Sequence, residues 1–248
     1  MNKDCIIVTG ASRGIGAAIA LALATQGHAV ACMSRSGAFP NVGDAPEDVK
    51  SRLLGVRADV TDPQGVRDSM RQLQEDGWRI TGLVNNAGVH TDAASAELTL
   101  EDWHHVMDAN ATSVITTSQA AYLYLVEAGG GVIVNIGSFF DKLGVKRNVA
   151  YCASKAAVGA ITRCLAVEWA GKGIRVVDVA PGYIVTDLNA DAMAPGGPLR
   201  NYLDKRIPGR EPGTAADIGA LVALLFSPAS RFLSGETLYV DGAQGIAH

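Results

Sequence analysis

Short apolar runs alternate with longer stretches of helical periodicity along most of the chain. The runs, which we expect to be strands, are CIIVT (5–9), HAVACMS (28–34), RLLGVRADV (52–60), ITGLVNNAG (80–88), GVIVNIGS (131–138), IRVVDVAPG (174–182) and GETLYVDG (235–242). Those between Cys5 and Val179 are typical of parallel strands buried on both faces. Because helices separate them, right-handed crossovers are expected. The pattern predicts a single α/β domain over 1–248, with a doubly wound parallel sheet of about seven strands.

The stretches between the runs predict helices, with two exceptions. Helices are expected at 14–27, at about 63–76, at about 100–126 and from near Asn148 onward. Residues 36–51 are polar, so a crossover helix there is expected to be short or frayed. Residues 187–213 are rich in proline and glycine, and a loop of that length in a compact domain is usually functional. We expect it to fold over a substrate as a lid.

Composition narrows the class of protein. The 248 residues are 48% hydrophobic and 19% charged, with a net charge of −4, which supports a sizeable core and argues against a broad nucleic-acid surface. Neither a signal-peptide pattern nor a membrane-spanning run is expected. Cys5, Cys32, Cys152 and Cys164 form no C-x-x-C pair, so we expect reduced thiols, no metal site and a cytoplasmic location.

A glycine-rich loop, TGASRGIG (9–16), follows the first run and precedes the first helix. Its Gly10, Gly14 and Gly16 have G-x-x-x-G-x-G spacing. Glycines permit a tight turn and a close backbone approach, and the N-terminus of the helix supplies free N–H groups for a phosphate. Alone, the loop could be a plain strand-to-helix turn. Placed after the first strand of a Rossmann-type sheet, it indicates a dinucleotide site.

The end of the second run bears on the choice of cofactor. An acid at this place would bind the ribose 2′-hydroxyl of NAD, but the chain has Ser34, Arg35 and Ser36 there. An arginine would instead bind a 2′-phosphate, and Arg13 in the glycine loop could be a second cation. Each arginine alone could be a solvated surface charge. Together they predict NADP(H) in preference to NAD(H).

The stretch AYCASK (150–155) places Tyr151 four residues before Lys155. Residues four apart meet on one face of a helix. An ammonium beside the phenol would favour phenolate and lower the tyrosine pKa from about 10 toward neutrality, as a general acid/base requires. The alternative is a surface pair of no consequence, which is common on helices.

In chain order, these motifs resemble those of the short-chain dehydrogenase/reductase family, in particular its 3-oxoacyl-(acyl-carrier-protein) reductase-like branch. The matching pieces, which span nearly the whole chain, are TGASRGIG, ADV (58–60), NNAG (85–88), Asn110 in DANAT, Ser138 in IGS, YCASK (151–155), and PG (181–182) with Thr186. The resemblance implies an oxidoreductase that moves a hydride between a nicotinamide and a ketone or secondary alcohol.

The resemblance also implies a role for each matching residue. Tyr151 would be the general acid/base, Lys155 would bind the nicotinamide ribose and lower the pKa of Tyr151, and Ser138 would hold the substrate oxygen. Asn110 would anchor a water between Lys155 and solvent. The implied cofactor contacts are Gly10, Ser12, Arg13, Gly14, Ile15, Gly16, Ser34, Arg35, Ser36, Asp59, Val60, Asn85, Asn86, Ala87, Gly88, Tyr151, Lys155, Pro181, Gly182, Ile184 and Thr186. The substrate candidates are Ser138, Phe140, Tyr151 and Tyr183, with Phe139, His90 and Met193 as further possibilities.

Other functions of the same fold stay open at this point. A non-catalytic nicotinamide redox sensor would not need the Tyr151 set, and a sugar-nucleotide epimerase or dehydratase usually has a larger C-terminal domain. A 3-oxoacyl-(acyl-carrier-protein) reductase of fatty acid synthesis needs cations for its carrier. Residues 122–131 contain none, whereas Lys142, Lys146 and Arg147 lie nearer the site.

The long helices predict a homo-oligomer, with a dihedral tetramer as the expected state. Apolar residues occupy more faces of these helices than one sheet can cover. Examples are Val114, Ile115, Tyr122, Ile161, Leu165 and Trp169.

Overall fold

Seven parallel strands form the central sheet of the protein. The computed structural model describes residues 3–187 and 189–247. The strands are β1 (Lys3–Thr9), β2 (Ala29–Ser34), β3 (Leu53–Arg57), β4 (Trp78–Asn85), β5 (Gly131–Ile136), β6 (Ile174–Pro181) and β9 (Thr237–Val240). Their order is β3-β2-β1-β4-β5-β6-β9, and every neighbouring pair is parallel. This arrangement confirms the predicted doubly wound α/β sheet.

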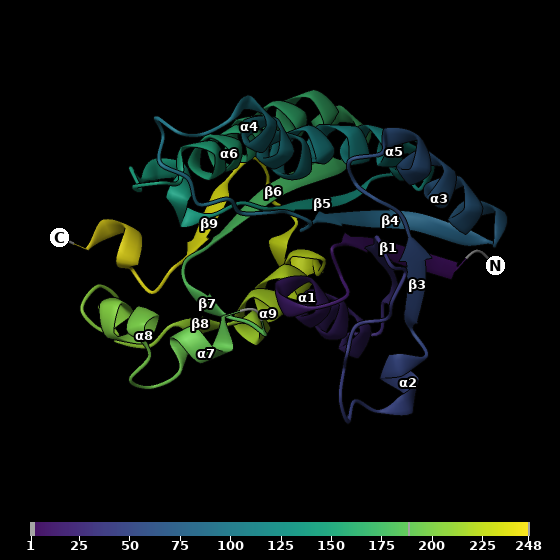
Figure 1. Cartoon of the computed structure of the whole chain (residues 1–248). Coiled ribbons are helices and arrows are strands. Elements are labelled where there is room, and N and C mark those ends of the chain that lie inside the picture. The colour runs from purple at the N-terminus through teal and green to yellow at the C-terminus, as the bar shows by residue number, and fades with distance from the viewer. Residues whose placement is uncertain (1–2, 188, 248) are drawn as a thin grey trace.

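Helices cover both faces of the sheet (Figure 1). α1 (Gly14–Thr25) and α9 (Ala215–Leu225) lie on one face, and α3 (Pro63–Glu75), α4 (Leu100–Met107), α5 (Ser113–Glu127) and α6 (Val149–Trp169) lie on the other. Alternate side chains of β1 fill the two cores. Ile6 and Val8 pack with α1 and α9, whereas Cys5 and Ile7 pack with α3, α5 and α6. No helix among the described residues is long and apolar enough to cross a bilayer.

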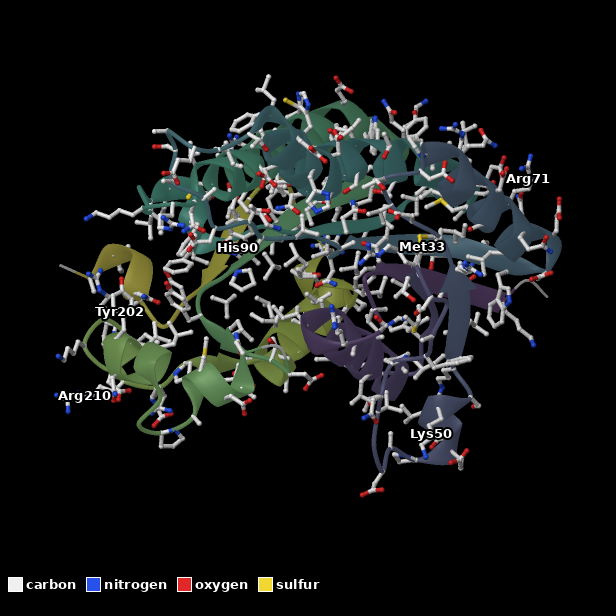
Figure 2. All side chains as sticks on the ribbon, in the orientation of Figure 1. Met33, Lys50, Arg71, His90, Tyr202 and Arg210 are labelled. Atoms are coloured by element: carbon white, nitrogen blue, oxygen red, sulfur yellow. The ribbon has the colours of Figure 1, made fainter. Side chains whose placement is uncertain are left out.

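β3 is the strand that departs from the predicted burial. It is an edge strand, with Gly55 and Arg57 exposed, so the expectation that its run is buried on both faces was wrong. The preceding crossover explains the difference, because its helix α2 (Glu47–Lys50) has only four residues and does not cover the edge. Figure 1 shows α2 projecting away from the sheet, and Lys50 lies at this tip in Figure 2. The short helix within 36–51 was predicted.

The helix predicted over 100–126 is not continuous. A π-helical segment, Asp108–Thr112, separates α4 from α5. Its wider turn contains Asn110 and shifts the register between the two helices. Helix α9 was not predicted, because its sequence, AADIGALVALL, is apolar around most of its circumference.

Residues 189–213 contain more regular structure than the loop that the sequence predicted over 187–213. They contain two short helices, α7 (Ala190–Met193) and α8 (Pro198–Leu203). Met193, Leu203 and Ile207 form a small apolar cluster of their own. The two-stranded sheet β7 (Ile184–Val185) and β8 (Gly213–Thr214) closes the base of the segment.

Candidate active site

The predicted motifs converge at the carboxyl ends of the parallel strands. The glycine loop follows β1, Ser34 ends β2, Asn85 ends β4, Ser138 follows β5 and Gly182 follows β6. Strands β1 and β4 are adjacent, and the chain order reverses between them, which creates the crevice where doubly wound folds bind their ligands. The predicted cofactor contacts that stay partly or fully accessible include Gly10, Ser12, Arg13, Gly14, Ile15, Arg35, Ser36, Asp59, Val60, Asn86, Ala87, Gly88, Tyr151, Gly182 and Thr186.

The glycine loop has the geometry of a phosphate cradle. Gly10 and Gly14 have φ values of +65° and +57°, which side chains rarely adopt. A Cβ on Gly16 would collide with the carbonyl of Gly10. At the start of α1, Arg13 makes no capping hydrogen bond and the first turn contains no acid. Its first N–H groups therefore have no side-chain partner, which fits a bound phosphate.

Asn86 and Thr9 fix the end of β4 to the glycine loop. The Asn86 amide donates to the carbonyls of Thr9 at 2.9 Å and Gly10 at 3.2 Å. The Thr9 hydroxyl accepts from the N–H groups of Asn86 and Ala87, each at 3.0 Å. Asn85 instead is buried, and its amide donates to Ser118 and Asn135. The side chain of Asn85 therefore joins β4 to α5 and β5 inside the core. The side chain of Asn86 instead holds the glycine loop in place beside the crevice.

Asn110 joins three parts of the site from its π-helical segment. Its amide donates to the carbonyl of Val89 at 2.9 Å and to Oγ of Ser154 at 3.1 Å, and its Oδ1 accepts from the N–H of Val89 at 2.7 Å. A Cβ on Gly88 would lie 3.0 Å from Oδ1 of Asn110 and 3.8 Å from Nζ of Lys155. Asn110 is 1% exposed, so it is a structural anchor for the chain that follows β4.

Tyr151, Lys155 and Ser138 meet between α6 and the end of β5. Nζ of Lys155 lies 5.7 Å from the centre of the Tyr151 ring and donates to the carbonyl of Ile136 at 2.7 Å. Ser138, which is buried, accepts from the N–H of Phe140 at 3.2 Å. Helical spacing therefore brings the ammonium against the phenol, and the strand end presents the hydroxyl.

Burial controls the ionisation of this group of residues. Burial raises the pKa of Tyr151, and the Ser138 hydroxyl only partly opposes the rise. The expected lowering of this pKa by Lys155 is therefore not what the structure gives, because desolvation of the phenolate outweighs the Ser138 hydrogen bond, and Lys155 is not among the groups that lower the pKa. The pKa of Lys155 itself falls to about 8, since its ammonium is buried.

At the other end of the crevice, Arg13 and Arg35 are both exposed. Oγ of Ser34 and Oγ of Ser36 lie 3.4 Å apart in the turn around Arg35. Hydrogen bonds from Thr61 lower the pKa of Asp59, and the charge of Arg35 adds to that effect. A third arginine, Arg57, lies beside Ser34 in the sheet register and was not predicted.

The segment that follows β6 borders the glycine loop. A Cβ on Gly14 would lie 3.7 Å from Cγ2 of Thr186, so the two motifs are in contact. The N–H of Gly182 donates to Val240 at 2.9 Å, and the N–H of Thr186 donates to Oδ1 of Asn189 at 2.8 Å. Pro181 and Ile184 are buried and form a wall beneath this segment.

A family profile described as "Enoyl-(Acyl carrier protein) reductase" matches residues 10–243, a span that contains these motifs apart from Thr9. The chain belongs to the short-chain dehydrogenase/reductase family. Members of this family are oxidoreductases that use a nicotinamide cofactor, so this short-chain dehydrogenase/reductase is an enzyme of that type.

Characterised relatives of this short-chain dehydrogenase/reductase have different substrates in their names. D-threitol dehydrogenase of Mycolicibacterium smegmatis is 36% identical, over 99% of this chain and 94% of its own. 2-Dehydro-3-deoxy-D-gluconate 5-dehydrogenase of Bacillus subtilis is 35% identical, over 95% and 92%. The 3-oxoacyl-(acyl-carrier-protein) reductase of Vibrio cholerae is 34% identical, over 95% of each chain.

Solved structures agree with the fold. A short-chain type dehydrogenase/reductase from Mycobacterium marinum matches with a TM-score of 0.84 at 32% identity, over 99% of this chain and 96% of its own. A structure from Beutenbergia cavernae with NADP bound at low occupancy matches with a TM-score of 0.87 at 32% identity, over 99% and 97%. The match covers nearly the whole length of each chain.

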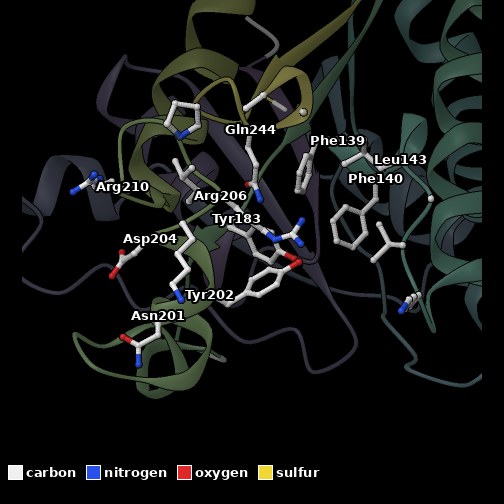
Figure 3. Close-up of a pocket in the computed structure, with 18 residues that line it drawn as sticks. Phe139, Phe140, Leu143, Tyr183, Asn201, Tyr202, Asp204, Arg206, Arg210 and Gln244 are labelled. Atoms are coloured by element: carbon white, nitrogen blue, oxygen red, sulfur yellow. The ribbon is translucent and has the colours of Figure 1, made fainter.

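A cavity of about 1840 Å³ opens next to Tyr151 in this short-chain dehydrogenase/reductase (Figure 3). Its walls come from residues within 139–146, 201–210 and 244–247, together with Tyr183. Tyr151 does not line it, but Phe140 does, and the rings of Phe140 and Tyr151 meet edge-on with their centres 6.0 Å apart. Of the predicted substrate residues, Phe139, Phe140 and Tyr183 therefore line one cavity.

The two remaining candidates differ in position. His90 packs edge-on against Tyr151, with ring centres 5.1 Å apart, and its Nε2 forms a hydrogen bond with Oδ1 of Asn148. Met193 is buried in the apolar cluster of the 187–213 segment and does not line the cavity. His90 therefore borders Tyr151, whereas Met193 has a packing role.

Asp178 on β6 is a residue that sequence reasoning missed. Its side chain is fully buried, Oδ2 accepts from Oγ1 of Thr237 at 3.0 Å, and Oδ1 has no hydrogen-bond partner among the described residues. Burial raises its pKa to about 6, an effect that Thr237 and Lys155 oppose. A carboxyl in an apolar strand, IRVVDVAP, was the available signal, since such a group is costly to bury.

Proposed function

We propose that this short-chain dehydrogenase/reductase interconverts a ketone and a secondary alcohol with NADP(H), using Tyr151 as the general acid/base. The observation that carries the proposal is the convergence of Tyr151, Ser138 and Lys155 at the carboxyl end of β5. Lys155 is 6% exposed and Ser138 is 7% exposed, so both polar groups are held in a site from which most water is excluded. Such a group would be costly to bury without a function.

The chain's own residues divide the chemistry between them. When bound, the nicotinamide supplies or accepts the hydride. Oγ of Ser138 donates a hydrogen bond to the substrate oxygen and stabilises the charge that develops there. In reduction the phenol of Tyr151 gives its proton to that oxygen, and in oxidation the phenolate takes it back. Because burial raises the pKa of Tyr151, the free protein holds the phenol protonated, which suits reduction.

Lys155 and Asn110 bind or position other groups of the site and do not transfer the proton. The ammonium of Lys155, fixed by the carbonyl of Ile136, binds the nicotinamide ribose and places a positive charge next to the Tyr151 ring. The Asn110 amide donates to the carbonyl of Val89 and to Oγ of Ser154, the residue before Lys155, and so fixes the chain on both sides of the site. We propose, from the family resemblance, that Asn110 also anchors a water between Lys155 and solvent. Gly10, Gly14 and Gly16 hold the pyrophosphate at the start of α1.

The preference for NADP(H) is part of the proposal. Arg13 and Arg35 are exposed, and the structure adds Arg57 beside Ser34. A 2′-phosphate at the end of β2 would neutralise part of this charge through charge-assisted hydrogen bonds. The structure from Beutenbergia cavernae, which has NADP bound at low occupancy, supports this preference.

We further propose that 187–213 acts as a lid and that the protein is a homotetramer. Met193 of α7 and Leu203 of α8 share one small apolar cluster, which supports a segment that moves as a unit over the cavity. Leu123 and Val167, on α5 and α6, are 66% and 81% exposed, which fits a surface covered by a second subunit. The cytoplasmic location stays a prediction.

The relatives support a small hydroxylated substrate. Two of them are named for a polyol and a sugar acid, at 36% and 35% identity, so overall similarity does not choose between a neutral and a charged substrate. The relative named for carrier-bound oxoacyl groups is close behind at 34%. We propose a small alcohol or ketone that does not need a carrier protein.

A substrate panel and one variant test the proposal. Purified protein is supplied with ketones plus NADPH, or with secondary alcohols plus NADP⁺, and absorbance at 340 nm is followed. Tyr151→Phe is expected to lose nearly all turnover while its affinity for NADPH, measured by calorimetry, stays near that of the wild type. Near-normal turnover in this variant would remove Tyr151 from the mechanism.

A further inference from the structure

The cavity beside the reaction centre has a strongly uneven charge. Four cations, Lys146, Lys205, Arg206 and Arg210, line it, against one carboxylate, Asp204. Asp204 is already paired, because Nε of Arg200, which does not line the cavity, donates to it at 2.7 Å. Within 3–187 and 189–247, no ion pair involves any of the four cations. The cavity therefore has a positive potential that a negative ligand would neutralise.

Arg206 is the cation whose position is best defined. Its guanidinium carbon lies 4.6 Å from the centre of the Tyr202 ring, a distance typical of a cation–π contact. Burial raises the pKa of Tyr183, and the charge of Arg206 opposes the rise, so the guanidinium also lies near the Tyr183 phenol. Figure 3 shows the side chains of Arg206, Tyr183 and Tyr202 gathered together in the cavity. The three form a donor-rich pocket, since a guanidinium and two phenols all donate hydrogen bonds.

This pocket is connected to the reaction centre through one aromatic ring. Phe140 packs edge-on against Tyr151 and also against Tyr183, with ring centres 6.0 Å apart in each case. A carbon chain lying along Phe140 would therefore have its reacting carbon at Tyr151 and a distal group at Tyr183 and Arg206. One ligand could therefore contact Tyr151 at one end and the cations of the cavity at the other.

We propose that the substrate is a hydroxylated carbon chain with an anionic group, a carboxylate or a phosphate, several carbons from the reacting carbon, and that Arg206 binds this group with help from Tyr183 and Tyr202. The inference rests on the proposed function, because it places the reacting carbon at Tyr151. Arg206 presents two parallel N–H groups to an anion, which a neutral polyol cannot match.

The test compares matched substrates that differ in charge. Wild-type protein with NADP⁺ is assayed with D-gluconate, with D-glucitol 6-phosphate and with neutral D-glucitol, together with their four- and five-carbon counterparts. The carboxylate and phosphate arms distinguish the two sources of the anion. We expect at least one acid to have a kcat/KM tenfold or more above that of its neutral counterpart. A neutral polyol as the best substrate, or a clear preference for reducing acetoacetyl-coenzyme A with NADPH, would overturn the proposal.

Arg206 is then replaced. Arg206→Gln should lower kcat/KM for the acid by about tenfold to a hundredfold, mostly through KM, and should leave the neutral polyol within about threefold. Arg206→Lys should recover part of the loss, because the charge returns without the paired N–H groups. The matched control is Arg71→Gln, because Arg71 lies at the opposite end of the molecule from Tyr202 and Arg210 in Figure 2. This variant should leave kcat/KM unchanged for both the acid and the polyol. Equal losses for acid and polyol would overturn the role of Arg206.

A binding measurement separates this inference from the proposed function. Calorimetry of D-gluconate and D-glucitol 6-phosphate against protein saturated with NADP⁺ needs no turnover. Absence of turnover with every alcohol and ketone would contradict the proposed function, while binding of an acid that depends on Arg206 would still support the anion site. Turnover of neutral substrates without Arg206-dependent binding of any acid would contradict the anion site alone.

Discussion

Asp178 and Lys155 are opposite charges buried beneath one site, and each favours the ionised form of the other. Burial raises the pKa of Asp178 to about 6, and Lys155 opposes that rise. Burial lowers the pKa of Lys155 to about 8, and Asp178 opposes that fall. The charge beside Tyr151 therefore depends on a β6 side chain that no substrate would touch.

The stability of the protein should depend on Asp178 and on pH. Its folded pKa of about 6 exceeds the ordinary value of 3.8, so between these values the folded state holds a proton that the unfolded state has lost. Stability contributed by this group is therefore present below pH 3.8 and falls as pH rises to 6. Asp178→Asn should remove this slope and raise the free energy of unfolding at pH 7 by up to about 3 kcal/mol.

Urea denaturation at pH 4.5, 6 and 7.5 checks the slope. Asp44→Asn, at an exposed position, is the matched control and should follow the wild type. In the same Asp178 variant, the decline of activity at high pH should begin at a lower pH, because Lys155 loses the carboxylate that supports its charge. An unchanged pH profile would show that the two groups are not coupled in function.

Asn110→Ala should damage turnover and stability together. The change removes hydrogen bonds to Val89 and Ser154 from a fully buried position, at a cost of about 1–3 kcal/mol. We expect kcat to fall by at least about tenfold, because the chain beside Lys155 is released. Ser118→Ala, which removes a buried partner of Asn85, is the control. If both variants lose stability but neither loses kcat, Asn110 is only a structural residue.

Arg35→Asp should reverse the cofactor preference. A charge-assisted contact with the 2′-phosphate contributes about 1.5–3 kcal/mol, so kcat/KM for NADPH should fall by about tenfold to a hundredfold. NADH should be unaffected or improved, and high salt should reduce the difference between the two cofactors, because Arg35 is exposed. Arg67→Asp on α3 is the control. A wild-type preference for NADH would show that the turn after β2 does not bind phosphate.

Light scattering should give a mass near four chains of 25.8 kDa at micromolar concentration. Leu123→Arg combined with Val167→Arg should reduce that mass, since both side chains lie on the outer faces of α5 and α6. Phe39→Arg, at another exposed apolar position, should not reduce it. A monomeric wild type would contradict the oligomer.

The sequence predicted those parts of the site that depend on local spacing. The glycine loop and the pair Tyr151 and Lys155 are each set by one strand-to-helix turn or one helical turn. The sheet followed from the apolar runs, and the structure confirms the doubly wound parallel sheet, although β3 is an edge strand and is not buried on both faces.

What the sequence missed depends on tertiary placement. In the sequence, Asp178 is only a charged residue within an apolar strand. Its role depends on Lys155 and Thr237, which only the fold brings near it. The π-helical turn at Asn110 has no signal in DANAT. Arg206 could not be identified as a candidate substrate residue from the sequence, because only the fold places it in the same cavity as Phe140, more than sixty residues earlier in the chain.

The close packing of α1 against α9 has a consequence for how the chain folds. Figure 1 shows the two helices side by side, and Gly219 of α9 approaches so closely that a Cβ there would lie 2.7 Å from the carbonyl of Ala18. The apolar side of α1 is therefore covered by a segment that is synthesised about 200 residues later. During translation, the N-terminal strands and α1 must wait, partly exposed, until the C-terminal part emerges. Folding is expected to be slow for this size, because contacts so distant in sequence form late.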